Sequence, residues 1–306
     1  MNILVTGATS MIGLSLCKRL CKDNNQIIAV VRKNSCKLDK LPKTDNIKIL
    51  ECDMQDYSLL SGMYAEEIDS AVLLAWNGTR GVHRNDAELQ RSNYEANMAV
   101  LQQLMQMNCK NIITAGSQAE YGLWHSTEKL QETAIPSPNT EYGKYKLKFY
   151  EEAREICHVN RIRLTEPRFF SLYGPNDFEG TMIISILKKM LSGEICDLTQ
   201  CIQLWDFLYI DDAIEGLIKL LETQDAFGVY NFGYGEKESV SLKSYIQKMY
   251  ELTHSASILN YGAIPYPETG MVNVNPCVDK LKSLGWEPKV SFEEGVREVI
   301  KALQDY

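Results

Sequence analysis

The chain has 306 residues, 45% of them hydrophobic and 24% charged, so its composition is that of a globular protein rather than a disordered or fibrous one. A formal net charge of −8 without a clustered basic segment argues against a nucleic-acid polymer as its partner. No apolar stretch approaches the roughly 20 residues of a membrane span, and the nine cysteines and four scattered histidines suggest reduced core thiols in a cytoplasmic protein without a metal site.

The first segment, MNILVTGATSMIG, predicts a strand, a tight turn and the start of a helix. Ile3 to Val5 is a short apolar run, as in strands buried on both faces, and apolar residues recur at helical spacing from Met11 to Leu20. A helix N-terminus behind such a turn presents free N–H groups and a positive dipole end, which favour a phosphate. The residues predicted to form this dinucleotide site are Gly7, Thr9, Ser10, Met11, Ile12 and Gly13.

The second expected strand, from Gln26, ends in the two cations Arg32 and Lys33, and the nearest acid is Asp39. In dinucleotide-binding folds the adenosine ribose lies at this strand end. A carboxylate there selects the 2′-hydroxyl, whereas an arginine accommodates a 2′-phosphate. We therefore predict NADP as the cofactor, with NAD as the alternative. The purely structural explanation of the two cations is that they lie at a solvated strand edge.

Two further strands are expected at Ile47–Asp53 and Ser70–Ala75. The purely structural alternative for Asp53 is that it caps a helix that begins near Tyr57. The polar loop behind the second of these strands, with Asn77 and Gly78, stands at a strand C-terminus, where ligands collect in an open parallel sheet. It is a predicted substrate-binding loop.

A fifth strand is expected at Asn111–Ser117, and a helix from about Glu141 to Cys157 follows a polar loop. Tyr142 and Lys146 are four residues apart at the start of this helix, so they share one helix face. Reduction of a ketone by hydride leaves an alkoxide that needs a proton donor and a hydrogen-bond partner. Tyr142 suits the acid/base role, Lys146 its tuning and a ribose contact, and Ser117 the hydrogen bond to the oxygen.

A free tyrosine, with a pKa of about 10, ionises too reluctantly to act as both acid and base near neutral pH. The Lys146 ammonium and an oxidised nicotinamide would each favour the phenolate, so we expect them to lower the pKa of Tyr142. A chance pair on a surface helix is the structural alternative.

Three segments of the second half extend these patterns, namely RFFSLYGP from Arg168, WDFLYIDD from Trp205 and VYNFG from Val229. Together with the glycine turn, in which Ser10 replaces the middle glycine, they resemble the extended short-chain dehydrogenase/reductases of the NAD-dependent epimerase/dehydratase family. The resemblance spans the whole chain. It implies an α/β fold, with a Rossmann-type doubly wound parallel sheet over residues 1–170. Residues 171–306 would form mainly a smaller α/β substrate lobe, with some segments returning to the sheet.

The resemblance also implies roles for single residues. The family places a G-D-L stretch beside the adenine, and Asp53 and Met54 occupy the matching positions. The end of the fourth strand matches the family's V-x-H-L-A-A and adds Ala75 and Trp76 to the cofactor site. Asn93 and Arg168 complete the predicted cofactor set, although Asn93 could equally be a surface amide.

Departures from the family pattern bear on the substrate. Ser171 stands where an asparagine is usual near the substrate diphosphate, and Trp205 where many members have an arginine. Gln118 and Ala119 replace the Asp-Glu pair of 4,6-dehydratases, which argues against water elimination. The predicted substrate residues are Asn77, Gly78, Gln118, Ser171 and Trp205.

The segments GSQAEYG and WDF look most like the CDP-abequose synthase group, which reduces 4-keto-6-deoxy sugar nucleotides. The resemblance therefore implies NADPH-dependent reduction of such a nucleotide sugar, with the CDP form favoured. An NAD-dependent 4-epimerase shares the same trio and is the alternative. A non-catalytic dinucleotide sensor is less favoured, because such sensors typically lose the tyrosine or the lysine.

Relatives commonly form homodimers through the helices expected at about 87–107 and 141–157. On the first of these helices, Val100, Leu101, Leu104 and Met105 could face a second chain or the sheet.

Overall fold

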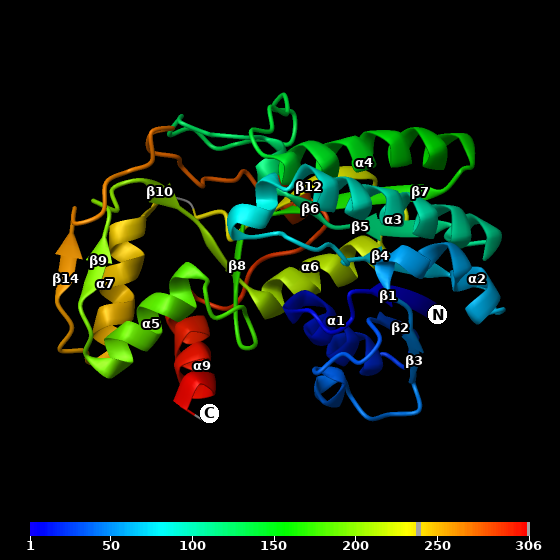
Figure 1. Ribbon diagram of the computed structural model, residues 1–306, viewed down its shortest axis with the longest axis horizontal. Coiled ribbons are helices and arrows are strands. Elements are labelled where there is room, and N and C mark those ends of the chain that lie inside the picture. The colour runs from blue at the N-terminus through cyan, green and yellow to red at the C-terminus, as the bar shows by residue number, and fades with distance from the viewer. Residues whose placement is uncertain (237–239, 305–306) are drawn as a thin grey trace. The chain divides into compact units, whose positions relative to one another are not determined.

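The computed structural model describes residues 1–236 and 240–304, which form two compact units (Figure 1). The first unit contains Met1–Gly122, Thr133–Phe169 and Ile214–Tyr230. The second contains Leu123–Glu132, Phe170–Ala213 and the segment that begins at Asn231. Each unit is therefore assembled from three stretches of the chain.

The large sheet has the strand order β12-β7-β5-β4-β1-β2-β3, with β6 paired to β7. Its strands are β1 (Asn2–Thr6), β2 (Gln26–Val31), β3 (Ile47–Glu51), β4 (Ser70–Leu73), β5 (Asn111–Thr114), β6 (Gly116–Ser117), β7 (Arg163–Phe169) and β12 (Gly228–Phe232). β1 is parallel to both of its neighbours, β2 and β4, so the strand order reverses at β1. This arrangement confirms the predicted doubly wound parallel sheet.

Side-chain caps mark where two of the helices of this unit begin. Ser10 accepts a hydrogen bond from the Gly13 N–H, and Thr140 accepts one from the Gly143 N–H. The α-helices are α1 (Met11–Cys21), α2 (Leu60–Met63), α3 (Ala87–Gln106), α4 (Glu141–Val159) and α6 (Ile210–Glu222). Short 3₁₀ segments are η1 (Leu38–Lys40), η2 (Met54–Leu59), η3 (Gly81–Asn85) and η4 (Gln118–Glu120). α3 and α4 lie side by side (Figure 1).

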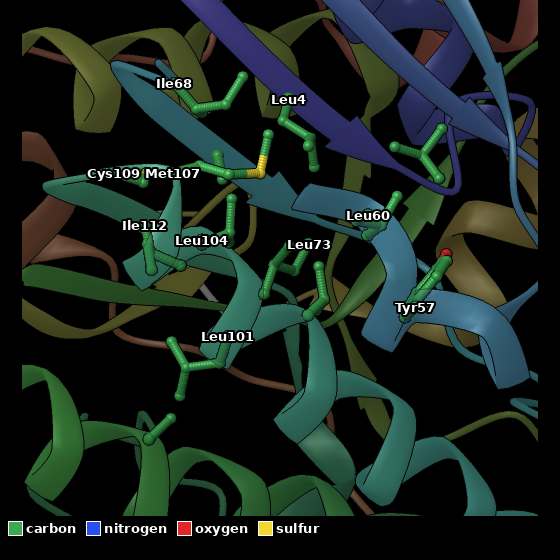
Figure 2. Close-up of a cluster of buried hydrophobic side chains, with 14 of the residues drawn as sticks. Leu4, Tyr57, Leu60, Ile68, Leu73, Leu101, Leu104, Met107, Cys109 and Ile112 are labelled. Atoms are coloured by element: carbon green, nitrogen blue, oxygen red, sulfur yellow. The ribbon is translucent and has the colours of Figure 1, made fainter. Parts of the chain in front are cut away.

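A buried apolar cluster joins the sheet to α2, α3 and η2. Figure 2 shows Leu73 from β4 and Ile112 from β5 in the same cluster as Leu101 and Leu104 from α3. Leu101, Leu104 and Val100 have no exposed surface. These three side chains therefore belong to the core, and the homodimer stays a prediction that they do not support.

The second unit contains three two-stranded sheets. They pair β8 (Ser171–Tyr173) with β11 (Phe207–Tyr209), β9 (Cys196–Leu198) with β14 (Leu259–Tyr261), and β10 (Leu204–Trp205) with β13 (Val240–Ser241). Its helices are α5 (Met182–Ser192), α7 (Leu242–Thr253), α8 (Asp279–Lys282) and α9 (Phe292–Gln304). In the described part of the chain, no helix has the length and apolar character needed to cross a membrane.

Gly13 tests how closely α1 packs on the first turn. A Cβ there would lie 2.4 Å from the Gly7 carbonyl oxygen and 2.7 Å from the Ala8 Cα, both backbone atoms. We expect Gly13→Ala to lower the free energy of unfolding by about 1–3 kcal/mol, as overpacking does. Gly62→Ala is the matched control, because a Cβ on Gly62 meets nothing within 4 Å. It should stabilise α2 by up to about 1 kcal/mol. Urea denaturation measures both, and equal effects would contradict the close packing.

Candidate active site

The turn behind β1 approaches the backbone behind β4. Gly7 has a φ of 66°, which favours glycine, and a Cβ there would lie 2.9 Å from the Ala75 nitrogen. The buried Thr6 hydroxyl accepts hydrogen bonds from the N–H groups of Leu74 at 3.1 Å and Ala75 at 3.3 Å. The carboxyl ends of β1 and β4 are thereby fixed at the point where the strand order reverses, which is where open α/β sheets bind ligands.

A cleft with a volume of about 210 Å³ lies over these strand ends. Its lining includes eight of the residues predicted for cofactor or substrate: Gly7, Thr9, Ser10, Arg32, Met54, Ala75, Trp76 and Asn77. The other predicted cofactor residues are not part of that lining: Met11, Ile12, Gly13, Lys33, Asp53, Asn93 and Arg168. Several other residues that line the cleft belong to none of the predicted motifs: Val30, Val31, Ser35, Cys36, Lys37, Tyr57 and Leu74.

The two predicted cations at the end of β2 have different environments. Arg32 lines the cleft, whereas the Lys33 ammonium forms an ion pair with Asp56 at 3.0 Å. The Asp53 carboxylate accepts a hydrogen bond from the Lys33 N–H at 3.1 Å and makes no side-chain cap to η2. Asp53 therefore stands at the N-cap position of η2, as the helix-cap alternative expected, but without a side-chain cap bond. The second cation in the cleft lining is Lys37, whose position five residues beyond Arg32 was the available signal.

Asn93 holds the loop that follows β4. It is 1% exposed, accepts a hydrogen bond from the Asn77 N–H and donates one to the Asn77 carbonyl, both at 2.9 Å. The surface-amide alternative is thus wrong. Gln90, one turn earlier on α3 and fully buried, donates to the carbonyls of Gly78 and His83 and accepts from the Trp76 indole N–H. Two amides on one face of α3 therefore fasten the loop.

Ser117 and Tyr142 meet where β6 ends and α4 begins. Ser117 Oγ accepts a hydrogen bond from the Ala119 N–H at 3.2 Å. Tyr142 is only 7% exposed. Burial raises the pKa of Tyr142, whereas the Ser117 side chain and the cations Arg84 and Arg80 oppose that rise. The pKa of Tyr142 is therefore raised overall, because burial outweighs the neighbouring charges, and the expected lowering of this pKa is not found.

Lys146 is buried one turn further along α4. Its ammonium donates to the Ala115 carbonyl at 2.6 Å and lies 3.9 Å from the centroid of the Trp76 ring. Burial lowers the pKa of Lys146 to about 8, against the opposing influence of Glu120 and Glu166. A π face and a carbonyl hold the cation, and the described residues form no salt bridge with it. The chance surface pair considered above does not describe these two side chains, which are both buried.

Arg168 lies beneath this site in a buried charge cluster. Its guanidinium donates to Glu120 at 2.9 Å and to Glu166 at 3.0 Å, and all three side chains are at most 2% exposed. The other Glu120 oxygen accepts the Ser117 N–H at 2.7 Å. Ser117 and Glu120 form a capping box, which the S-x-x-E spacing in the sequence could have revealed. The cluster therefore fixes the backbone of Ser117.

The predicted substrate residues fall into both units. Asn77 and Gly78 belong to the loop that Asn93 and Gln90 fasten, and Gln118 begins η4 directly after Ser117. Ser171 on β8 and Trp205 on β10 belong to the second unit. The buried Trp205 indole nitrogen has no hydrogen-bond partner among the described residues, so it is a donor that remains to be satisfied.

Comparison with known proteins identifies the class. Residues 3–233 match the NAD dependent epimerase/dehydratase family, and the chain belongs to that family. It is 26% identical to CDP-abequose synthase from Salmonella muenchen, over 98% of this chain and 97% of that protein. It is 24% identical to UDP-glucuronate 4-epimerase from Thermodesulfobacterium geofontis, over 97% of this chain and 94% of that protein.

Solved structures show the same fold. UDP-glucose 4-epimerase from Thermotoga maritima, determined with UDP-glucose, has a TM-score of 0.89 and 23% identity over 100% of this chain and 99% of its own. The enzyme of the same name from Thermus thermophilus, determined with NAD, has a TM-score of 0.86 and 20% identity, covering 99% of each chain. The predicted family and the Rossmann-type fold are thus confirmed.

Burial of the Lys146 ammonium predicts a pH-dependent stability difference. The unfolded chain keeps this proton up to about pH 10.5 and the folded chain up to about 8, so the unfolded state binds more protons between those values. Relative to Lys146→Met, the parent protein should therefore gain roughly 2–4 kcal/mol of stability as the pH rises through that window. Urea denaturation near both ends of the window measures the difference. Lys144→Met, at an exposed lysine of α4, controls for simple loss of charge, and a constant difference for Lys146→Met would contradict the prediction.

Proposed function

We propose that the protein reduces a 4-keto-6-deoxyhexose nucleotide to the corresponding alcohol with NADPH. The observation that carries this proposal is the buried Tyr142 phenol at the start of α4, with a Ser117 side chain that lowers its pKa and the Lys146 ammonium one helical turn away. A proton donor, a hydrogen-bond partner and a cation are what reduction of a ketone requires of the protein. Membership of the NAD dependent epimerase/dehydratase family supports the same chemistry.

The residues around the cleft fit a dinucleotide. The turn at Gly7 leaves room that a Cβ would fill, and Ser10 caps the start of α1, whose N-terminal N–H groups suit a pyrophosphate. Arg32 and Lys37 line the part of the cleft beyond β2, where a 2′-phosphate would find two cations, and Ser35 is hydrogen-bonded to Thr9 there. Bound NADPH would supply the hydride.

The protein's own part in the reduction is proton delivery and alignment. The Tyr142 hydroxyl would donate its proton to the oxygen of the new alcohol while Ser117 hydrogen-bonds that oxygen. Lys146 would contact the ribose and stabilise the phenolate that remains until solvent returns the proton. Glu120 and Arg168 would keep the Ser117 backbone in place during this step.

A CDP-linked sugar is the proposed substrate. The support is the similarity to CDP-abequose synthase over nearly the whole of both chains, together with Gln118 and Ala119 in place of a dehydratase carboxylate pair. Asn77, Gly78 and Gln118 would contact the sugar. Ser171 and Trp205 stay predicted substrate residues, and the unsatisfied Trp205 indole N–H suits a phosphate or ribose oxygen.

An NAD-dependent 4-epimerase is the second candidate. It is favoured by the similarity to UDP-glucuronate 4-epimerase, which covers as much of this chain as the reductase similarity does, to within a percent. Both reactions use the same tyrosine, so the trio alone does not separate them. The cations Arg32 and Lys37 in the cleft favour NADPH, and hence the reductase.

Cofactor preference tests the assignment of the cations. We expect tighter binding of NADPH than of NADH, and about 10- to 100-fold weaker NADPH binding in Arg32→Asp, because one charged hydrogen bond is lost. Lys37→Met should weaken NADPH more than Lys33→Met, since Lys33 is already paired with Asp56. Fluorescence titration of both cofactors into the purified protein measures this. Equal affinity of the parent protein for NADPH and NADH would contradict the proposal.

Cofactor stoichiometry tests the reaction. We expect protein purified with little bound dinucleotide to oxidise one NADPH for each CDP-4-keto-6-deoxyhexose consumed. Tyr142→Phe should bind NADPH normally but turn over at least about 100-fold more slowly. Protein that arrives loaded with NAD and interconverts two sugar nucleotides without consuming NADPH would instead identify an epimerase. Normal turnover by Tyr142→Phe would contradict both catalytic readings.

A further inference from the structure

The Tyr142 ring has a cationic neighbour that belongs to no recognised motif. The Arg84 guanidinium lies over the Tyr142 ring, with its Cζ 4.9 Å from the ring centroid. Arg84 comes from η3, the short helical segment in the loop behind β4, and is half-buried. Trp76 meets the same ring edge-on, with centroids 6.3 Å apart and an interplanar angle of 82°. The acid/base candidate is therefore enclosed by a cation as well as by an aromatic edge.

The loop is fastened on both sides of Arg84. The carbonyl of the preceding residue, His83, accepts a hydrogen bond from the buried Gln90 amide at 2.9 Å. The side chain of the following residue, Asn85, accepts the Glu141 N–H at 3.3 Å, in the first turn of α4. The backbone that carries Arg84 is thus tied to α3 and to the helix turn that carries Tyr142. Its place over the ring follows from these ties and does not depend on a flexible surface loop.

Lys146 is occupied by other partners. Its ammonium donates to the Ala115 carbonyl and lies on the Trp76 ring, and among the described residues no carboxylate forms an ion pair with it. The four side chains Arg84, Tyr142, Trp76 and Lys146 consequently form a series in which the two aromatic rings stand between two cations. Each cation has its own ring.

We propose that Arg84 is a positioning residue for the proposed reaction, one that holds the Tyr142 ring toward Ser117 and stabilises its ionised form through the ring face. The proposal rests on the proposed role of Tyr142. A guanidinium over a buried aromatic ring is attracted to the ring while the phenol is neutral, and more strongly once the phenol has lost its proton. Arg84 therefore favours the state that Tyr142 enters when it gives its proton away.

The charges that face Tyr142 come from several elements. Arg84 and Arg80 from the loop lower the pKa of Tyr142, Glu120 on η4 raises it, and burial raises it most. Ser117, at the end of β6, also lowers it. Removal of the Arg84 charge should therefore raise the pKa of Tyr142 further and make the phenol a weaker acid.

The first test measures the ionisation of the Tyr142 phenol in the absence of a sugar substrate. The protein is labelled with [¹³Cζ]tyrosine, the Tyr142 resonance is assigned by its absence in Tyr142→Phe, and its ionisation is followed by NMR. We expect the midpoint to move to higher pH in Arg84→Met and to stay near the parent value in Arg84→Lys. Arg154→Met is the matched control, at an exposed arginine about 18 Å along the same helix, and should leave the midpoint unchanged.

The second test uses turnover. With Tyr142 as the proton donor, activity falls as the pH rises through its pKa, so Arg84→Met should shift that alkaline limb upward. Its kcat near neutral pH should fall about tenfold, with the KM for NADPH unchanged and recovery in Arg84→Lys. A role in loop structure alone would leave the pH profile in place, and Arg84→Lys would not restore the rate.

The two tests separate this inference from the proposed function. A Tyr142 midpoint in Arg84→Met equal to that of the parent, in a protein with native chemical shifts elsewhere, would overturn the role of Arg84. Normal turnover by Tyr142→Phe would instead overturn the proposed function, whatever the NMR result. Should Arg84→Met fold poorly, Arg84→Gln keeps the hydrogen-bonding head group without the charge, and the same shift of its midpoint is expected.

Discussion

The close approach between the turn behind β1 and the backbone behind β4 determines where this protein can bind a ligand. Thr6 ties the two strand ends together with one hydroxyl, and Gly7 removes the Cβ that would keep them apart. Both features act at the reversal of strand order, so the cleft opens over the carboxyl ends of the strands. Gly7, Leu74, Ala75, Trp76 and Asn77 in the cleft lining belong to this junction or to the loop that leaves it.

Buried charge at the site is costly to folding and useful to the proposed chemistry. Lys146 and the cluster of Arg168 with Glu120 and Glu166 are almost fully buried, and desolvation penalises their charged forms. The protein offsets that penalty with hydrogen bonds to Ala115 and Ser117 and with the π face of Trp76. Glu120 and Glu166 also oppose the lowering of the Lys146 pKa, but burial outweighs them.

Local patterns in the sequence predicted the elements well, because apolar runs and caps act over short distances. The strand, turn and helix at Ile3–Leu20 and the pairing of Tyr142 with Lys146 depend on such spacing. Side-chain partners are harder to predict, because they depend on the folded chain. Lys33 forms an ion pair with Asp56, and Arg168 forms ion pairs with the buried residues Glu120 and Glu166. The sequence alone does not decide between a cofactor residue and a surface amide for Asn93. Only the folded loop shows which backbone groups its side chain satisfies.

The loop behind β4 connects these observations. The Trp76 ring of this loop lies against the Lys146 ammonium, and the Arg84 guanidinium lies over the Tyr142 ring. Asn77 of the same loop lines the cleft. Gln90 and Asn93 hold this loop by hydrogen bonds from a single face of α3, while Trp76 packs against the apolar cluster. Because these bonds go to backbone groups of the loop, its exposed side chains can change without altering its path. Trp76 and Arg84 would then keep their places over Lys146 and Tyr142.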